Sequence, residues 1–164
     1  PVTESPEFFG QTVNLAQRLC NTARNGHIMI SSEIKEQMHE EFPDAITDTK
    51  IIALNPKDEE FVNQVMEVIQ TYWDDPSFDI NSFGRKSGLS KAQLYRRLTS
   101  LFGYSPNGFI KEYRLRKTLE TIEKQKGNVA EIAYQSGFSS PSYFSKCFQK
   151  RFGILPAAFA ASII

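Results

Sequence analysis

Two helix-length segments of the sequence, fifty residues apart, each carry small or polar side chains along one face. These side chains are Ala92, Tyr95, Arg96 and Thr99 in the first segment, then Ser142, Ser145, Lys146 and Gln149 in the second. In the major groove of B-DNA an arginine can bond guanine O6 and N7, a lysine can do so less rigidly, and short polar side chains reach base edges. Faces of this kind therefore indicate recognition of bases in duplex DNA.

The opposite face of each segment is mostly apolar and predicts a helix packed against a core. These inner positions are Leu94, Leu98 and Leu101, with Arg97 at the edge, and then Phe144, Phe148 and Arg151, with Cys147 beside them. Each segment is therefore expected to be an amphipathic helix that presents its polar side outward.

The elements that position these faces form an internal repeat, which predicts two helical hairpins. Residues 87–90 (Ser-Gly-Leu-Ser) match residues 136–139 (Ser-Gly-Phe-Ser) at an offset of 49, and residues 102–106 match 152–156 at an offset of 50. Gly88 and Gly137 allow the tight turn of a helix-turn-helix, since glycine takes positive φ without a Cβ clash. Ser90, and either Ser139 or Ser140, are candidate caps of the following helix.

The first hairpin is predicted over about 79–102 and the second over about 128–152, joined by an apolar-striped helix over 107–124. If both polar faces enter successive major grooves of one duplex, they should lie about 34 Å apart. The alternative is that each element is only a helical hairpin with a solvated polar face. Two copies in register favour the recognition hypothesis over that alternative.

Charge is divided unevenly along the 164-residue chain, although the total is zero. Residues 1–78 hold 5 Lys/Arg against 14 Asp/Glu, a net charge of −9, whereas residues 79–164 hold 14 against 5, a net charge of +9. An acidic segment attached to a basic one favours a polyanionic partner for the basic part. The acidic front segment could also compete with DNA for the basic face, as an autoinhibitory element.

Composition narrows the class of protein. The sequence has no run of about 18 apolar residues and does not begin like a signal peptide, so a cytoplasmic protein is expected. Cys20 and Cys147 lie far apart, without ligand partners at useful spacing, and are expected to be buried free thiols. No metal site and no cofactor are therefore expected.

The front of the chain reads as mixed α/β. Its predicted elements are a helix over 13–23, a strand over 27–31, a helix over 32–38 capped by Ser32, a strand over 50–54 and a longer helix over 61–73. Asn55-Pro56 marks the expected domain boundary, which divides the chain into residues 1–55 and 56–164.

Residues 57–164 resemble the AraC/XylS family of bacterial transcription regulators. The stretches 137–148 and 150–156 are very similar to the family's signature, and Arg114-Leu115 and Ser105-Pro106 also fit. The resemblance implies a mainly α, seven-helix module with two helix-turn-helix motifs that binds promoter DNA in a sequence-specific way. Promoter DNA is then the expected partner, with RNA polymerase as a possible second one.

The resemblance also implies which residues read bases. The family's reading positions fall on Ala92, Tyr95 and Arg96, then on Ser142, Ser145 and Lys146. The full predicted DNA-binding set is Lys91, Ala92, Gln93, Tyr95, Arg96, Thr99, Ser140, Ser142, Ser145, Lys146, Gln149 and Lys150. The chain departs from the family at Gly84 and Thr118, where alanine is common, and at Ala161, where an arginine often contacts a phosphate.

A shorter resemblance covers residues 9–19 and 26–31, which are similar to the later part of a class III nucleotidyl cyclase domain. In that family an Asn and an Arg one helical turn apart steady the ribose and the charge on the phosphate, roles that would fall on Asn14 and Arg18. The family's metal-binding aspartates are not in this sequence, so a noncatalytic remnant is expected rather than an enzyme. A fragment of a cyclase fused to a DNA-binding output domain is the alternative function.

Overall fold

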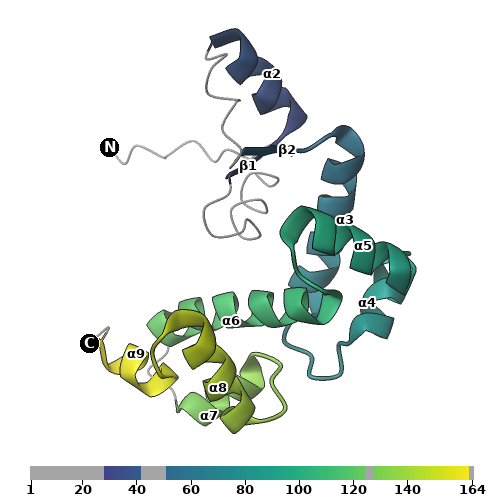
Figure 1. The fold of residues 1–164 in the computed structure, drawn as a ribbon. Helices are drawn as coiled ribbons and strands as arrows, with labels where there is room; N and C mark the ends of the chain where they lie inside the picture. The colour runs from purple at the N-terminus through teal and green to yellow at the C-terminus, as the bar shows by residue number, and fades with distance from the viewer. Residues whose placement is uncertain (1–27, 42–50, 125–127, 163–164) are drawn as a thin grey trace, which may run out of the picture. The chain divides into compact units, whose positions relative to one another are not determined.

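The computed structural model describes residues 28–41, 51–124 and 128–162 (Figure 1). The chain forms two compact units, Pro1–Glu67 and Val68–Ile164, here called the N-terminal and C-terminal units. The domain boundary expected after Asn55 falls where helix α3 (Pro56–Tyr72) begins, and a division of function at that point stays a prediction. None of the helices in the described part of the chain is long and apolar enough to cross a membrane.

The N-terminal unit contains a small parallel sheet. Strand β1 (Ile28–Ile30) pairs with strand β2 (Ile51–Ala53), with Ile28 opposite Ile51, and helix α2 (Ser32–Glu41) lies between them in the sequence. The prediction that Ser32 caps α2 was wrong. Its neighbour Ser31 fills that role, because the Ser31 hydroxyl accepts from the backbone N–H of Ile34 at 3.2 Å, while Ser32 donates to Glu59 through its backbone and its hydroxyl.

Helix α3 confirms the apolar spacing that predicted it. Phe61, Val62, Val65, Met66 and Ile69 are all at most 1% exposed. The helix starts five residues earlier than predicted, because the side chain of Asn55 accepts from the backbone N–H of Asp58 at 3.0 Å and caps its first turn.

Six further helices follow in the C-terminal unit. They are α4 (Ile80–Ser87), α5 (Lys91–Phe102), α6 (Pro106–Lys124), α7 (Val129–Gln135), α8 (Pro141–Phe152) and α9 (Pro156–Ser162). Helices α4 and α5 form the first hairpin, α7 and α8 form the second, and α6 runs between them (Figure 1). With α3 the described residues thus contain the seven helices of the expected mainly α fold.

The turns of the two hairpins have the same hydrogen bonding. In the first, Gly88 donates to the carbonyl of Arg85 and Leu89 to that of Gly84; in the second, Gly137 and Phe138 donate to residues three and five positions back in the same way. This is the Schellman pattern that ends a helix at a left-handed residue. Gly88 has φ 64° and Gly137 φ 74°, which confirms why glycine is needed at both turns.

Caps also repeat from one hairpin to the other. Asp79 caps α4 and Asn128 caps α7, each through a side-chain oxygen that accepts a backbone N–H. Hydrogen bonds from Ser82 and Asn81 lower the pKa of Asp79 to about 2, so the charged cap persists well into acid. Ser90 caps α5 and Ser140 caps α8, so the extra residue of the second hairpin lies in its turn.

Aromatic and aliphatic side chains fill a separate core in each hairpin, and α6 contributes to both. Phe102 packs on Phe109 of α6 with ring centroids 5.1 Å apart. The second core holds Leu115 and Ile122 of α6 with Phe144 and Phe148 of α8. Because α6 supplies side chains to the two cores, it is a structural link between them rather than a flexible tether.

Two departures from the family's alanines have local explanations. A Cβ added at Gly84 would lie 2.7 Å from the carbonyl oxygen of Leu89, so the turn crosses this helix at very close range. Thr118 is fully buried and donates from its hydroxyl to the Leu115 carbonyl at 2.5 Å, which satisfies the polar group that a threonine brings into the core.

Candidate nucleic-acid interface

Helix α5 presents the predicted side chains to solvent. The exposed residues are Lys91, Ala92, Gln93, Tyr95, Arg96 and Thr99. Leu94 and Leu98, on the opposite face, are fully buried, and Leu101 is half-buried. Tyr95 is 57% exposed, so its side chain is accessible to a partner.

Helix α8 has the same polarity, with two differences from the prediction. Ser142, Lys146, Gln149 and Lys150 are exposed, whereas Ser140 and Ser145 are half-buried. Phe144 and Phe148 are fully buried beneath them. A half-buried Ser145 can still reach a groove with a short side chain, but only at closer approach than Lys146.

Two of the predicted DNA-binding residues, Gln93 and Ser140, also stabilise the first turns of their own helices, α5 and α8. The side chain of Gln93 accepts from the backbone N–H of Ser90 at 2.9 Å, and Ser90 accepts in return from the N–H of Gln93. This capping box commits the carbonyl oxygen of Gln93 and leaves its NH2 group as a donor. Ser140 caps α8 by accepting from the N–H of Tyr143 at 3.3 Å, so its hydroxyl hydrogen can still be donated.

Tyr143 is a candidate that the sequence analysis omitted. It is 53% exposed, one residue after Ser142. A hydrogen bond with the Cys147 side chain raises the pKa of Tyr143. The sequence repeat could have indicated Tyr143, because it stands fifty positions after Gln93, a member of the predicted DNA-binding set.

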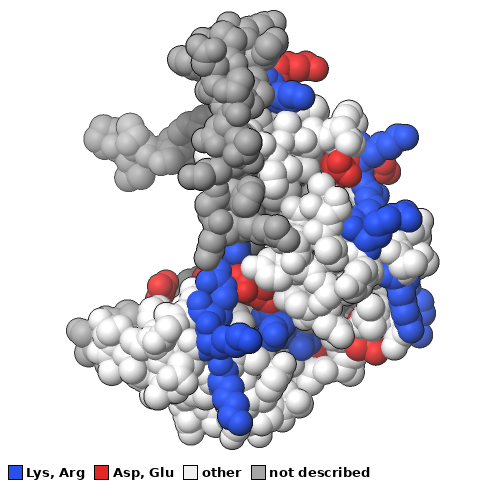
Figure 2. Space-filling view, in the orientation of Figure 1, with Lys and Arg blue, Asp and Glu red and all other residues white. Residues whose placement is uncertain are grey.

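Both exposed faces lie on helices without acidic residues. Helix α5 carries Lys91, Arg96 and Arg97, and helix α8 carries Lys146, Lys150 and Arg151. Figure 2 shows Lys and Arg side chains gathered over the region of α6 and α8, with further basic side chains over α4 and α5. A surface of this charge attracts phosphate groups at long range.

A half-buried arginine joins the second hairpin to the start of the C-terminal unit. Arg114 of α6 donates from Nε to the carbonyl of Trp73 and from Nη2 to that of Asp75, each at 2.7 Å. The Gly137 turn packs on the same atoms, because an added Cβ would lie 2.6 Å from the Trp73 oxygen. Burial lowers the pKa of Arg114, but a guanidinium stays charged in proteins, so this junction keeps its full set of donors.

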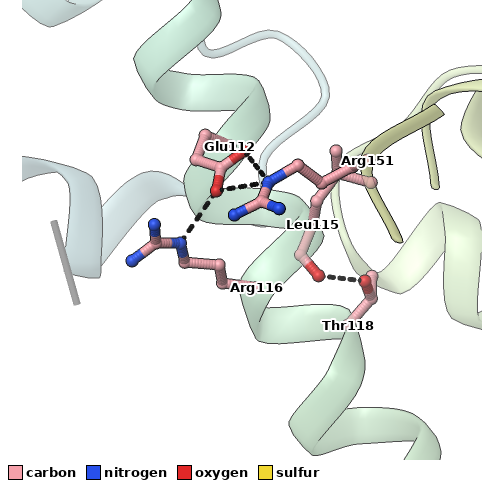
Figure 3. A network of polar contacts seen from close by, with 5 residues as sticks. All are labelled: Glu112, Leu115, Arg116, Thr118 and Arg151. Atoms are coloured by element: carbon pink, nitrogen blue, oxygen red, sulfur yellow. Dashed lines mark hydrogen bonds and ion pairs between the residues drawn. The ribbon is translucent and has the colours of Figure 1, made fainter. Parts of the chain in front are cut away.

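An ion-pair network ties α8 to α6. Glu112 of α6 accepts from Arg151, in the last turn of α8, and from Arg116, one turn further along α6 (Figure 3). A cleft of about 450 Å³ is lined by Asn107 and Lys111 of α6 and by Ser139 and Tyr143 of the second hairpin. The two hairpins are thus joined by α6 and a few specific contacts and are not packed together over their whole length.

Comparison with known proteins assigns the type of domain. The model of a helix-turn-helix domain family matches residues 83–162. The HTH-type transcriptional regulator MtrA of Neisseria gonorrhoeae is 32% identical over 94 residues, which are 56% of this chain and 31% of that protein. A transcriptional regulator with an AraC-type DNA-binding domain from Chromobacterium violaceum superposes with a TM-score of 0.60 at 20% identity, over 66% of this chain and 96% of that one.

Residues 83–162 form a helix-turn-helix domain that is similar to AraC-type DNA-binding domains. The expectation drawn from the sequence motifs of the two hairpins is therefore confirmed. Helices α5 and α8 are the second helices of its two hairpins.

A third comparison points to the range of proteins that use such a domain. Histidine kinase P4 of Formosa agariphila is 33% identical over 108 residues, which are 66% of this chain but 8% of that protein. The chain thus spans only a small part of the relatives that it matches. The family model starts at Phe83, and Asn14 and Arg18 of the cyclase-like motif lie outside the described residues.

Proposed function

We propose that the AraC-type domain binds duplex DNA in a sequence-specific way, with α5 and α8 in successive major grooves, and that it serves a bacterial transcription regulator. The observation that carries this proposal is the duplication: two hairpins with matching turns and caps each expose a recognition helix free of acidic residues. The DNA-binding domain of AdpA, a global transcriptional factor, was solved in complex with a target DNA and superposes with a TM-score of 0.55 at 25% identity, over 60% of this chain and 91% of that domain.

Within each recognition helix the proposed roles follow from side-chain chemistry. Arg96 and Lys146 stand at equivalent positions, fifty residues apart, and are both exposed; they are proposed to donate to guanine edges. Lys91, Lys150 and the capped start of α8 at Ser140 are proposed to contact phosphates, which fix position without reading sequence.

A protein partner and a role for the N-terminal segment are also proposed. RNA polymerase is a proposed partner, in line with a relative from Yersinia enterocolitica described as a transcriptional activator, which is 30% identical over 78 residues. Residues 1–55 are proposed to be a noncatalytic, cyclase-like remnant. Formation of a cyclic nucleotide from ATP or GTP by the purified chain, abolished by Arg18→Ala, would overturn that assignment.

Substitution of the two proposed guanine readers tests the DNA-binding proposal. Arg96→Ala and Lys146→Ala are each expected to weaken binding to a preferred duplex by about 1–3 kcal/mol and to relax selectivity at one position of the site. Equilibrium binding to a set of singly substituted duplexes measures both effects. Lys117→Ala, which removes a charge from α6, is the matched control and should leave the position-by-position selectivity as it is. If both variants bind with unchanged affinity and unchanged selectivity, the exposed faces of α5 and α8 do not read the bases.

A further inference from the structure

One nearly buried carboxylate holds the second recognition helix to α6. Glu112 is 8% exposed, and both of its oxygens lie 2.9 Å from Nε of Arg151. Arg116 donates from its own Nε to Oε1 of the same carboxylate, also at 2.9 Å. Figure 3 shows the carboxylate lying between the two guanidinium groups, one from α6 and one from α8.

The first hairpin is attached to α6 differently. The residue of α5 equivalent to Arg151 is Leu101, fifty positions earlier, which is apolar and half-buried. A turn of three residues, 103–105, joins α5 directly to α6, so the chain itself restricts the first recognition helix. Helix α8 has no such direct connection, since α7 and two loops lie between it and α6.

Side-chain contacts must therefore fix the position of α8 on α6. The aromatic core beneath α8 attracts it, but apolar contact is non-directional and tolerates small rotations. The Glu112 interactions are directional, because charged hydrogen bonds require short distances and aligned groups. A shift of α8 that separated Arg151 from Glu112 would weaken the pairing of a carboxylate that has little access to water, which is strongly disfavoured.

We propose that Glu112 is a positioning residue that sets the separation and rotation of the two recognition helices, and thereby the spacing between DNA half-sites that the domain accepts. The inference rests on the proposed function, since it assigns the spacing selectivity of that same interface. Glu112 itself lies in the protein interior, so its effect on DNA is indirect and acts through Arg151 and α8.

Binding to duplexes of altered spacing tests this role. The probes are a bipartite duplex selected by the unaltered chain, the same duplex with one base pair added or removed between the half-sites, and each half-site alone. Glu112→Gln keeps the volume and removes the charge. We expect it to raise Kd for the selected spacing on the order of tenfold, to bring the Kd ratio between altered and selected spacing towards one, and to leave half-site Kd values unchanged.

The controls separate this inference from the proposed function. Glu120→Gln removes an exposed carboxylate from the same helix, one that pairs with Lys117, and should keep the full spacing preference. If Glu112→Gln does not fold, Arg151→Leu replaces it, because leucine occupies the equivalent position of α5; its readout is the Kd ratio between altered and selected spacing alone, since the lost positive charge can also weaken half-site binding. An unchanged spacing ratio, or an equal loss on half-sites and bipartite sites, overturns the inference, whereas failure of the unaltered chain to bind any duplex overturns the proposed function.

Discussion

Replacing Phe148 with alanine is expected to lower the free energy of unfolding by about 3–5 kcal/mol, because a fully buried ring is removed and the cavity closes only in part. Phe148 is 0% exposed and lies within ring-contact distance of Phe144, Phe152 and Phe159, with centroids 5.6, 4.7 and 5.8 Å away. It is thus the centre of the apolar cluster that carries α8. Urea denaturation followed by circular dichroism measures the loss.

A leucine at the same position is the matched control. The equivalent residue of α5 is Leu98, which is also fully buried, so leucine suits this site in a hairpin of the same design. Phe148→Leu should be clearly more stable than Phe148→Ala, since it retains more of the buried apolar surface. A loss below about 1 kcal/mol for the alanine variant would contradict the described core.

Alanine at Gly137 is expected to destabilise the domain by about 2–5 kcal/mol, through two separable effects. The left-handed backbone, with φ 74°, opposes any side chain by about 1–2 kcal/mol. The new Cβ would also meet the Trp73 oxygen at 2.6 Å and Nε of Arg114 at 2.8 Å. Displacing these groups disturbs the part-buried hydrogen bond from Arg114 to the Trp73 carbonyl, at about 1–3 kcal/mol.

Gly153 offers a control that isolates the second effect. Its φ is 76°, but an added Cβ meets nothing within 4 Å. Gly153→Ala should therefore show the backbone cost alone, and the difference between the two variants measures the packing of the turn on Arg114. If the same denaturation experiment gives equal unfolding free energies for the two variants, the close packing of the Gly137 turn on Arg114 and the Trp73 carbonyl is contradicted.

Local features of the fold could be predicted from the sequence because their causes are local. The turn glycines, the cap at Ser90, and the burial of Leu94 and Phe144 follow from residue types within a few positions of one another. For α8 the sequence indicated a serine cap but did not distinguish Ser139 from Ser140, which fills the role. The repeat strengthened each of them, since the same local pattern occurs twice. Exposure of Arg96 and Lys146 followed for the same reason, from the helical period.

Contacts between distant segments could not be predicted in this way. The Glu112–Arg151 pair joins residues 39 positions apart, and Arg114 bonds the backbone of Trp73, 41 positions away. Every residue has a backbone carbonyl, so the sequence does not indicate which one Arg114 will bond. Arg151 lies at the end of a basic helix, where the sequence pattern does not distinguish a buried ion pair from a solvated charge. These contacts depend on how the hairpins dock against α6, which helical periodicity does not determine.

The proposed mode of binding requires that both recognition helices act on one duplex. Selection of bound sequences from a random duplex library by the purified chain, with Arg96→Ala and Lys146→Ala selected in parallel, tests this most directly. We predict a bipartite motif with half-sites about 10 base pairs apart, centre to centre, in which each variant loses information from a different half. A single short motif that the two variants alter in the same way, or do not alter, would contradict the binding of one duplex by both recognition helices.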